Sequence, residues 1–269
     1  MKGKEITMLR SIWQYRQFIL SCIKREFLAR YKGSVLGIVW SILQPLSMIF
    51  VYTVIFSEVM RAKLVGMDAD KMAYSIYLCS GVLTWDFFTQ SAMAGVNVFL
   101  GNGNLMKKLA FPRICLPMIS VGSAFLNFCI SFGLFFVALL IMGRFPFGEI
   151  IWFIPILVVQ TIFACSFGIG LGVLNVFFRD VGQLFGVVLQ FWFWFTPIVY
   201  PSSIIPQQLV GIMDFNPMYH IAKGYQSIFV YHQMPEFTGI FGVLGISVLL
   251  GIWSLKLYRN HVGEMVDEL

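Results

Sequence analysis

The stretch Ile114–Gly143, ICLPMISVGSAFLNFCISFGLFFVALLIMG, decides the class of this protein. It contains no charged residue and lies between Arg113 and Arg144. A transmembrane helix needs about 20 predominantly apolar residues to cross about 30 Å of hydrocarbon. This run therefore predicts a helix that spans a lipid bilayer.

The composition of the whole chain extends this conclusion. Of its 269 residues, 58% are hydrophobic and only 12% are charged, and the mean hydropathy is +0.81. Soluble domains carry about 25% charged residues. The five cysteines are scattered and fall mostly in apolar stretches, which indicates small core residues and no disulfide framework. These observations exclude a soluble domain and predict an integral membrane protein.

Six segments are long and apolar enough to cross the bilayer, which predicts an all-α membrane protein with six transmembrane helices. The predicted spans are residues 35–57, 76–100, 114–143, 150–178, 181–200 and 239–257. Asp86 is the one charged residue deep inside a span. It could contact a substrate or a proton, or it could cap a helix and face water near the membrane boundary.

The positive charges indicate the direction of the spans. Six spans place both termini on one side, where 14 of the 19 Lys and Arg residues then lie, against five on the other side. Because cytoplasmic loops carry the excess of positive charge, we expect both termini, including the tail 261–269, in the cytoplasm. The basic residues lie beside apolar spans, which argues against a nucleic acid partner.

Two regions are not simple spans. Residues 1–34 mix aromatic and aliphatic side chains with eight Lys and Arg residues, which is typical of an amphipathic helix in the headgroup layer. Residues 201–238 contain Pro201, Pro206 and Pro217 and then a short apolar stretch. This outer region could form re-entrant helices, or it could be a surface loop with one amphipathic helix.

No chemistry-bearing motif is evident. The sequence lacks the glycine spacing of an ATP-binding loop, so any ATP use requires another protein. His220, His232 and His261 do not have the spacing of metal ligands, and we expect no metal site. Two pairs of small residues, Gly168/Gly172 and Gly182/Gly186, predict close helix approach within the chain or between two copies.

Aromatic residues are unusually abundant, at 17% of the chain, and the run 191–195 reads FWFWF. Aromatic faces stack on sugar rings and also tolerate lipid chains, so they could line the path of a long amphipathic polymer. Alternatively, each could face lipid or pack in the core. The candidates for a translocation path are Trp85, Phe88, Phe191, Trp192, Trp194 and Tyr225.

Several motifs, in chain order, resemble those of ABC-type polysaccharide export permeases, which serve O-antigen, teichoic acid and capsule export. The segment RYKGSVLGIVW at 30–40, followed by Gln44-Pro45, resembles the start of the first span in that family. The further matches are WDFF at 85–88, KKLAFPR at 107–113, Leu116-Pro117, Arg179-Asp180, Thr196-Pro197 and Asn216-Pro217-Met218. The resemblance runs from about residue 10 to residue 260 and is strongest to the O-antigen lipopolysaccharide type.

The resemblance implies the type-2 ABC exporter permease fold, in the bacterial cytoplasmic membrane. It implies that two copies of this chain assemble with two copies of a cytoplasmic ATP-binding subunit. ATP and Mg²⁺ would bind that subunit, and this chain would bind no cofactor. The cargo would be an undecaprenyl-pyrophosphate-linked polysaccharide that passes between the two permeases.

The resemblance also assigns two groups of residues. The loop with Lys107, Lys108, Phe111, Pro112 and Arg113 would be the coupling helix that docks on the ATPase. From charge alone, this loop could equally contact anionic lipid. Arg25, Arg30, Tyr31 and Lys32 would meet the substrate pyrophosphate at the interface helix, or they could anchor that helix to the phosphates of membrane lipid.

Three other functions would also place this chain in a membrane. A drug or small-lipid exporter of the same superfamily would use the same aromatic surfaces. An ion-coupled secondary transporter would normally carry more ionisable residues inside its spans. A membrane-embedded transferase would require a convergent polar or His/Asp cluster, which the sequence does not indicate.

Overall fold

The computed structural model describes residues 15–59, 64, 72–103 and 115–269. Within these ranges, all regular secondary structure is helical. The helices are α2 (Arg16–Ala29), α3 (Trp40–Thr53), α4 (Ala73–Gly101), α6 (Cys115–Ile141), α7 (Phe153–Phe177), α8 (Asp180–Phe195), α9 (Gln207–Met213), α10 (Pro217–Phe229), α11 (Phe237–His261) and α12 (Glu264–Glu268). Short 3₁₀ turns at Gly37–Val39, Ile150–Trp152 and Ser202–Ile204 and a π-helical turn at Val54–Val59 complete the described elements.

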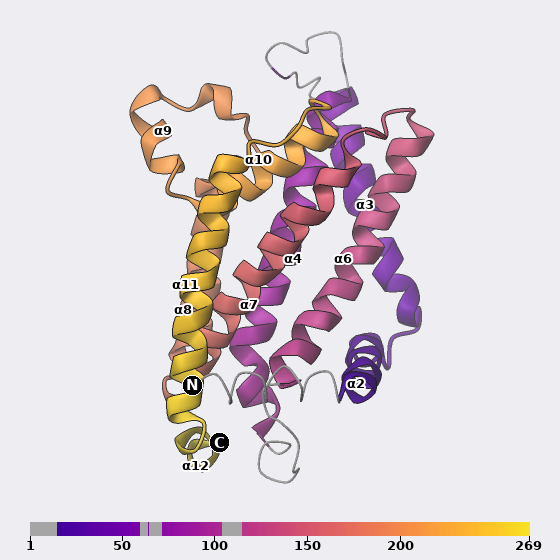
Figure 1. The fold of residues 1–269 in the computed structure, drawn as a ribbon. Helices are drawn as coiled ribbons and strands as arrows, with labels where there is room; N and C mark the ends of the chain where they lie inside the picture. The colour runs from indigo at the N-terminus through magenta and orange to yellow at the C-terminus, as the bar shows by residue number, and fades with distance from the viewer. Residues whose placement is uncertain (1–14, 60–63, 65–71, 104–114) are drawn as a thin grey trace.

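The long helices run along one bundle, as Figure 1 shows. At one end of the bundle, α2 lies across the helix ends, and α12 lies at the same end. At the opposite end, α10 crosses the bundle and packs on α4, α7 and α11, while α9 lies to one side. The short helices α2, α12, α9 and α10 therefore lie at the two ends of the bundle.

Four helical stretches have the length and apolar composition of a membrane span. They are Gly37–Phe56, Cys115–Ile141, Ile150–Phe177 and Phe237–His261, and they correspond to the first, third, fourth and sixth predicted spans. The six-span count is not confirmed, because neither α4 nor α8 has both the length and the apolar composition of these four stretches.

The two remaining helices fall short for different reasons. α8 has 16 residues, or about 24 Å at 1.5 Å per residue, and Pro197 follows its end. α4 is long enough, at 29 residues, but 21 of them are buried among other helices. A helix surrounded by protein does not need a continuous apolar surface, which explains the polar residues of α4.

The centre of the bundle is a close contact between α4 and α7. An ideal Cβ atom on Gly95 would lie 2.7 Å from the Cα of Gly168, and one on Gly172 would lie 2.5 Å from the carbonyl oxygen of Gly95. The two backbones therefore touch, as small residues allow in membrane proteins. This contact confirms the predicted packing role of Gly168 and Gly172.

The second predicted glycine pair has a different environment. The N–H of Gly182 donates a hydrogen bond of 2.9 Å to Oδ1 of Asn175, which ties the start of α8 to α7. A Cβ on Gly186 would meet no atom within 4 Å in the described structure. Of this pair, Gly182 alone lies in a close contact within the chain.

Buried polar side chains link the helices. Gln160 on α7 donates to the carbonyl oxygen of Thr84 on α4 (2.8 Å) and accepts from the hydroxyl of Tyr225 on α10 (2.8 Å). Asn175 donates to the carbonyl oxygen of Val96 (3.1 Å). These bonds satisfy groups that could not find water inside the bundle.

The outer region contains two helices, not a plain loop. α10 packs against α4, α7 and α11, and Tyr225 at its centre is 0% exposed. The hydroxyl of Tyr77 on α4 donates to the carbonyl oxygens of Pro197 and Tyr200, at 2.8 and 3.0 Å. Irregular backbone after α8 is thus satisfied by protein groups, and its depth in the membrane stays a prediction.

Substitution of Gly172 by alanine tests the helix contact. We expect Gly172→Ala to destabilise the protein by about 1–3 kcal/mol, because the added methyl group overlaps the backbone of α4. The measurement is the midpoint of thermal unfolding in detergent, followed by size-exclusion chromatography. Gly133→Ala on α6 is the matched control, because its Cβ meets nothing within 4 Å of the described chain. Equal midpoints for the two variants would contradict the contact.

Candidate functional site

The aromatic side chains proposed for a translocation path fall into two groups. Trp85, Phe88 and Tyr225 are buried, at 6%, 0% and 0% exposed. Phe191 and Trp194 are 63% and 60% exposed on α8. The path candidates therefore do not form one surface.

The half-buried Trp192 joins the buried group. Its ring centroid lies 6.2 Å from that of Trp85 and 5.4 Å from that of Phe88, both on α4. It also contacts Phe163 and Phe167 on α7, at 6.4 and 6.0 Å. These rings pack α8 against α4 and α7, and the role of Trp85, Phe88 and Trp192 in a path stays a prediction.

Tyr225 belongs to a separate aromatic cluster. Its ring lies 5.6 Å from Phe132 on α6 and 5.5 Å from Phe153 on α7, measured between centroids. Together with the hydrogen bond from its hydroxyl to Gln160, these contacts fix α10 in the bundle. Tyr225 is therefore enclosed by the described helices, and its place in a path stays a prediction.

One face of α8 is exposed and apolar. It consists of Leu184, Val187, Val188, Phe191, Trp194 and Phe195, each at least 44% exposed. Their spacing of three or four residues places them on one side of the helix. We call these six residues the α8 face. Because it carries large apolar side chains, either lipid or another chain must cover it.

Asn216 holds the outer end of α8. Its Oδ1 accepts hydrogen bonds from the indole N–H of Trp192 (2.8 Å) and from the N–H of Met218 (3.0 Å). Its Nδ2 donates to Oγ1 of Thr196 (3.0 Å). One amide therefore caps α10 and fixes both a packed tryptophan and the residue after α8.

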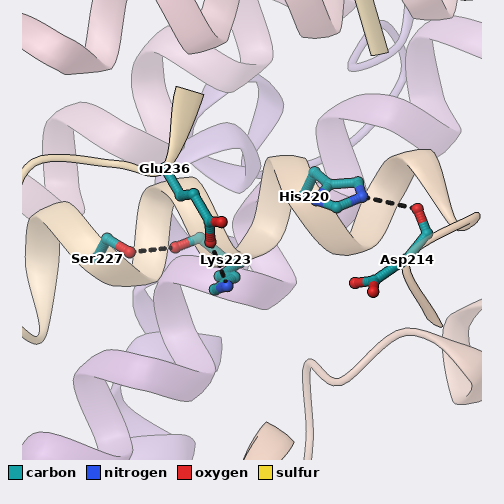
Figure 2. Close-up of polar contacts among 5 residues, drawn as sticks. All are labelled: Asp214, His220, Lys223, Ser227 and Glu236. Atoms are coloured by element: carbon teal, nitrogen blue, oxygen red, sulfur yellow. Dashed lines mark hydrogen bonds and ion pairs between the residues drawn. The ribbon is translucent and has the colours of Figure 1, made fainter. Parts of the chain in front are cut away.

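Polar side chains of α10, including His220 and Lys223, make the contacts that Figure 2 shows. Nζ of Lys223 lies 2.7 Å from Oε2 of Glu236, and the hydrogen bond and charge of Lys223 lower the pKa of Glu236. Nε2 of His220 lies 2.8 Å from the carbonyl oxygen of Asp214. The Lys223–Glu236 pair is largely exposed and therefore contributes little to stability.

A basic cleft of about 770 Å³ lies at the opposite end of the molecule. Arg25, Tyr31 and Lys32 line it, together with Lys24, while Arg30 is exposed beside it. Three of the four predicted substrate-contacting residues therefore share one cleft. Lys and Arg side chains around a cleft of this kind can bind phosphate groups.

Glu26 is the acidic residue of this cleft. Burial raises the pKa of its carboxyl group above the ordinary value, while the charge of Arg30 and a hydrogen bond with Ser120 act in the opposite direction. The carboxyl group lies between α2 and α6 and therefore offsets part of the positive charge of the cleft. The sequence analysis did not single out Glu26, because nothing in the pattern showed that it faces inward.

Comparison with known proteins identifies the family. The sequence profile of the ABC-2 type transporter family matches residues 17–230. The chain belongs to this family. An ABC-2 relative from Myxococcus xanthus, the O-antigen export system permease protein RfbA, is 30% identical over 98% of this chain and 100% of its own length.

Further ABC-2 relatives agree with this assignment. A protein of the same name from Klebsiella pneumoniae is 31% identical over 90% of this chain and 92% of its own. The polysialic acid transport protein KpsM from Escherichia coli is 21% identical over the same shares of the two chains. The predicted resemblance to polysaccharide export permeases is thereby confirmed.

The residues expected to couple this ABC-2 protein to an ATPase cannot be placed. Lys107, Lys108, Phe111, Pro112 and Arg113 lie outside the described residues. Their role as a coupling helix stays a prediction.

Asn216 is a structural residue whose role sequence reasoning missed. It formed part of a family motif, but no role was attached to it. An asparagine directly before a proline is a typical helix start, and this signal could have identified the cap of α10. Its bond to Trp192 could not be found in this way, because the two residues are 24 positions apart.

Two substitutions at Asn216 separate its roles. We expect Asn216→Ala to cost about 1–3 kcal/mol of stability, because the Trp192 indole N–H loses its partner. Asn216→Asp should cost less, because a carboxylate still accepts from Trp192 and from the N–H of Met218. The measurement is the unfolding midpoint in detergent together with the fluorescence spectrum of the protein. Equal losses for both variants would show that the bonds accepted by Asn216 do not matter.

Proposed function

We propose that this chain is the permease subunit of an ATP-driven exporter that moves lipid-linked, O-antigen-like polysaccharide across the bacterial cytoplasmic membrane. The observation that carries this proposal is the match with an O-antigen export permease over 98% of this chain and 100% of that protein. A similarity over the whole of both chains favours the same task and not merely the same fold. The ordered motifs of the sequence support the same conclusion.

We place the polysaccharide path between two copies of the chain. The α8 face is apolar, aromatic and not covered by the described part of its own chain. A twofold axis beside α8 would bring two such faces together, as closed symmetric dimers do. Phe191, Trp194 and Phe195 would then line the path, and sugar rings could slide over them.

The same arrangement accounts for the two helices that do not resemble lipid-facing spans. α8 would meet its counterpart in the second copy, and α4 is buried behind it. α4 therefore does not need the continuous apolar surface that lipid demands, and the second copy would cover the short helix α8. We therefore retain six spans with both termini in the cytoplasm, and we place α9 and α10 as re-entrant or capping helices at the outer end.

Energy would come from a separate subunit. The sequence has no ATP-binding loop, so ATP and Mg²⁺ would bind a cytoplasmic partner, in two copies. The basic loop with Lys107, Lys108 and Arg113 would dock in that partner and transmit its motion.

The substrate would load at the basic cleft. Lys24, Arg25 and Lys32 provide the charge for a pyrophosphate, and Leu28 and Ile38 provide an apolar wall for the start of the lipid chain. The cleft lies at the end of the bundle where α2 crosses it. This position suits a substrate that remains anchored in one leaflet.

A drug or small-lipid exporter is the second candidate function, because the α8 face would suit either cargo. The ligand that stimulates ATP hydrolysis by the reconstituted complex distinguishes the two functions. Stimulation by undecaprenyl-linked glycan supports polysaccharide export. Stimulation by hydrophobic drugs alone would favour the second candidate.

The double substitution Phe191→Ala/Trp194→Ala tests the path. We expect glycan export into proteoliposomes to fall several-fold, because two stacking surfaces are lost, while the complex still assembles. Phe241→Ala/Trp253→Ala on α11 is the matched control, since these side chains are also exposed, at 64% and 47%. Unchanged export in the α8 variant, or an equal loss in the control, would remove α8 from the path.

Charge reversal at Lys107 and Lys108 tests the coupling loop. We expect Lys107→Glu/Lys108→Glu to abolish most glycan-stimulated ATP hydrolysis without preventing membrane insertion, because the loop can no longer dock in the ATPase. The reversal Arg144→Glu, after the end of α6, controls for the introduction of a negative charge outside the loop. Normal stimulated hydrolysis in the Lys107/Lys108 variant would contradict the proposed contact.

A further inference from the structure

A second hollow lies on the other flank of α2, away from the basic cleft. It has a volume of about 370 Å³ and is bounded by α2, α6 and α7. This size falls within the range of about 300–1,000 Å³ that is typical of small-molecule sites. We call it the α2–α7 groove. No step of the proposed export cycle uses it.

The groove owes its shape to one close contact. The side chain of Ile23 on α2 rests on Gly122 of α6, where an ideal Cβ would lie 2.4 Å from Cδ1 of Ile23. α2 therefore packs on α6, and a gap remains between α2 and Thr161 and Cys165 of α7. Phe125 forms the inner wall of this gap.

The lining of the groove is apolar except at one position. Arg16, an exposed residue of α2, is the charged side chain among the described residues that line it. The groove opens beside exposed apolar residues, including Leu20 (63%) and Met118 (41%). It therefore continues into an exposed apolar surface, with a cation of α2 at its edge.

The groove is elongated along α6. Its lining on this helix runs from Met118 to Phe125, which is about 10 Å at 1.5 Å per residue. An elongated apolar groove of this kind suits part of an acyl chain.

We propose that the α2–α7 groove binds one anionic phospholipid, with its phosphate at Arg16 and one acyl chain against Phe125 and Thr161. The guanidinium group suits phosphate because it can donate two parallel hydrogen bonds. The bound lipid would connect α2 to α7, across the gap that the groove leaves between them. It thereby sets the position of α2, whose other flank forms the basic cleft.

Photolabelling tests the proposal on the full-length protein. The probe is phosphatidylglycerol with a diazirine near the end of one acyl chain, at low mole fraction in phosphatidylcholine vesicles. We expect labelled peptides to centre on Phe125, Thr161 and Cys165. Arg16→Gln should weaken labelling about fivefold, the effect of removing one basic residue near an anionic surface, while Arg16→Lys retains most of it.

Three further variants complete the test. Thr161→Trp fills the groove and should abolish labelling there. Val158→Trp adds the same ring to an exposed position of the same helix outside the groove, and should leave labelling unchanged. Lys24→Gln, on the other flank of α2, controls for net charge.

Three results would overturn the proposal. The first is label spread evenly over the lipid-facing helices and insensitive to both Thr161→Trp and Arg16→Gln. The second is equal labelling by a phosphatidylcholine probe. The third is displacement of the probe by undecaprenyl phosphate but not by phosphatidylglycerol, which would make the groove a carrier-lipid site. None of these results depends on export activity.

Discussion

The backbone contact between α4 and α7 is the constraint on which the rest of the bundle depends. Gly95, Gly168 and Gly172 let two long helices touch without side chains between them. α4 can then be enclosed by α6, α7, α8 and α10, and it carries polar groups that lipid would not tolerate. The bonds from Gln160 and Asn175 reach across this contact, because only closely spaced backbones bring their partners within range.

Some aromatic side chains pack in the interior of the bundle, and others lie exposed on the α8 face. Trp85, Phe88 and Trp192 fill the space beside the glycine contact and set the rotation of α8. That rotation leaves Phe191 and Trp194 facing outward. The α8 face is therefore a consequence of core packing, since a helix that buries one side must present the other.

The sequence predicted membrane spans best where the hydrophobicity of a segment directly reflects its surroundings. Charge-free runs such as 114–143 predicted four spans that the structure supports, because lipid-facing helices must be apolar all round. It was less informative for α4, whose neighbours hide its polar residues. The run 191–195 predicted an aromatic surface, but helical periodicity alone could not say whether Trp192 or Phe191 faced inward. That depends on Trp85 and Phe88, which lie about a hundred residues earlier in the chain.

The amide of Asn216 has a consequence for how this protein can vary. Because it bonds to Thr196, the chain from the end of α8 to the start of α10 forms a loop that is closed at its neck. Doubling the length of such a loop costs only about 0.6 kcal/mol. Insertions or deletions around α9 can therefore reshape the outer surface without moving either helix. Relatives that handle different cargo are free to diverge there, while the bundle beneath keeps one geometry.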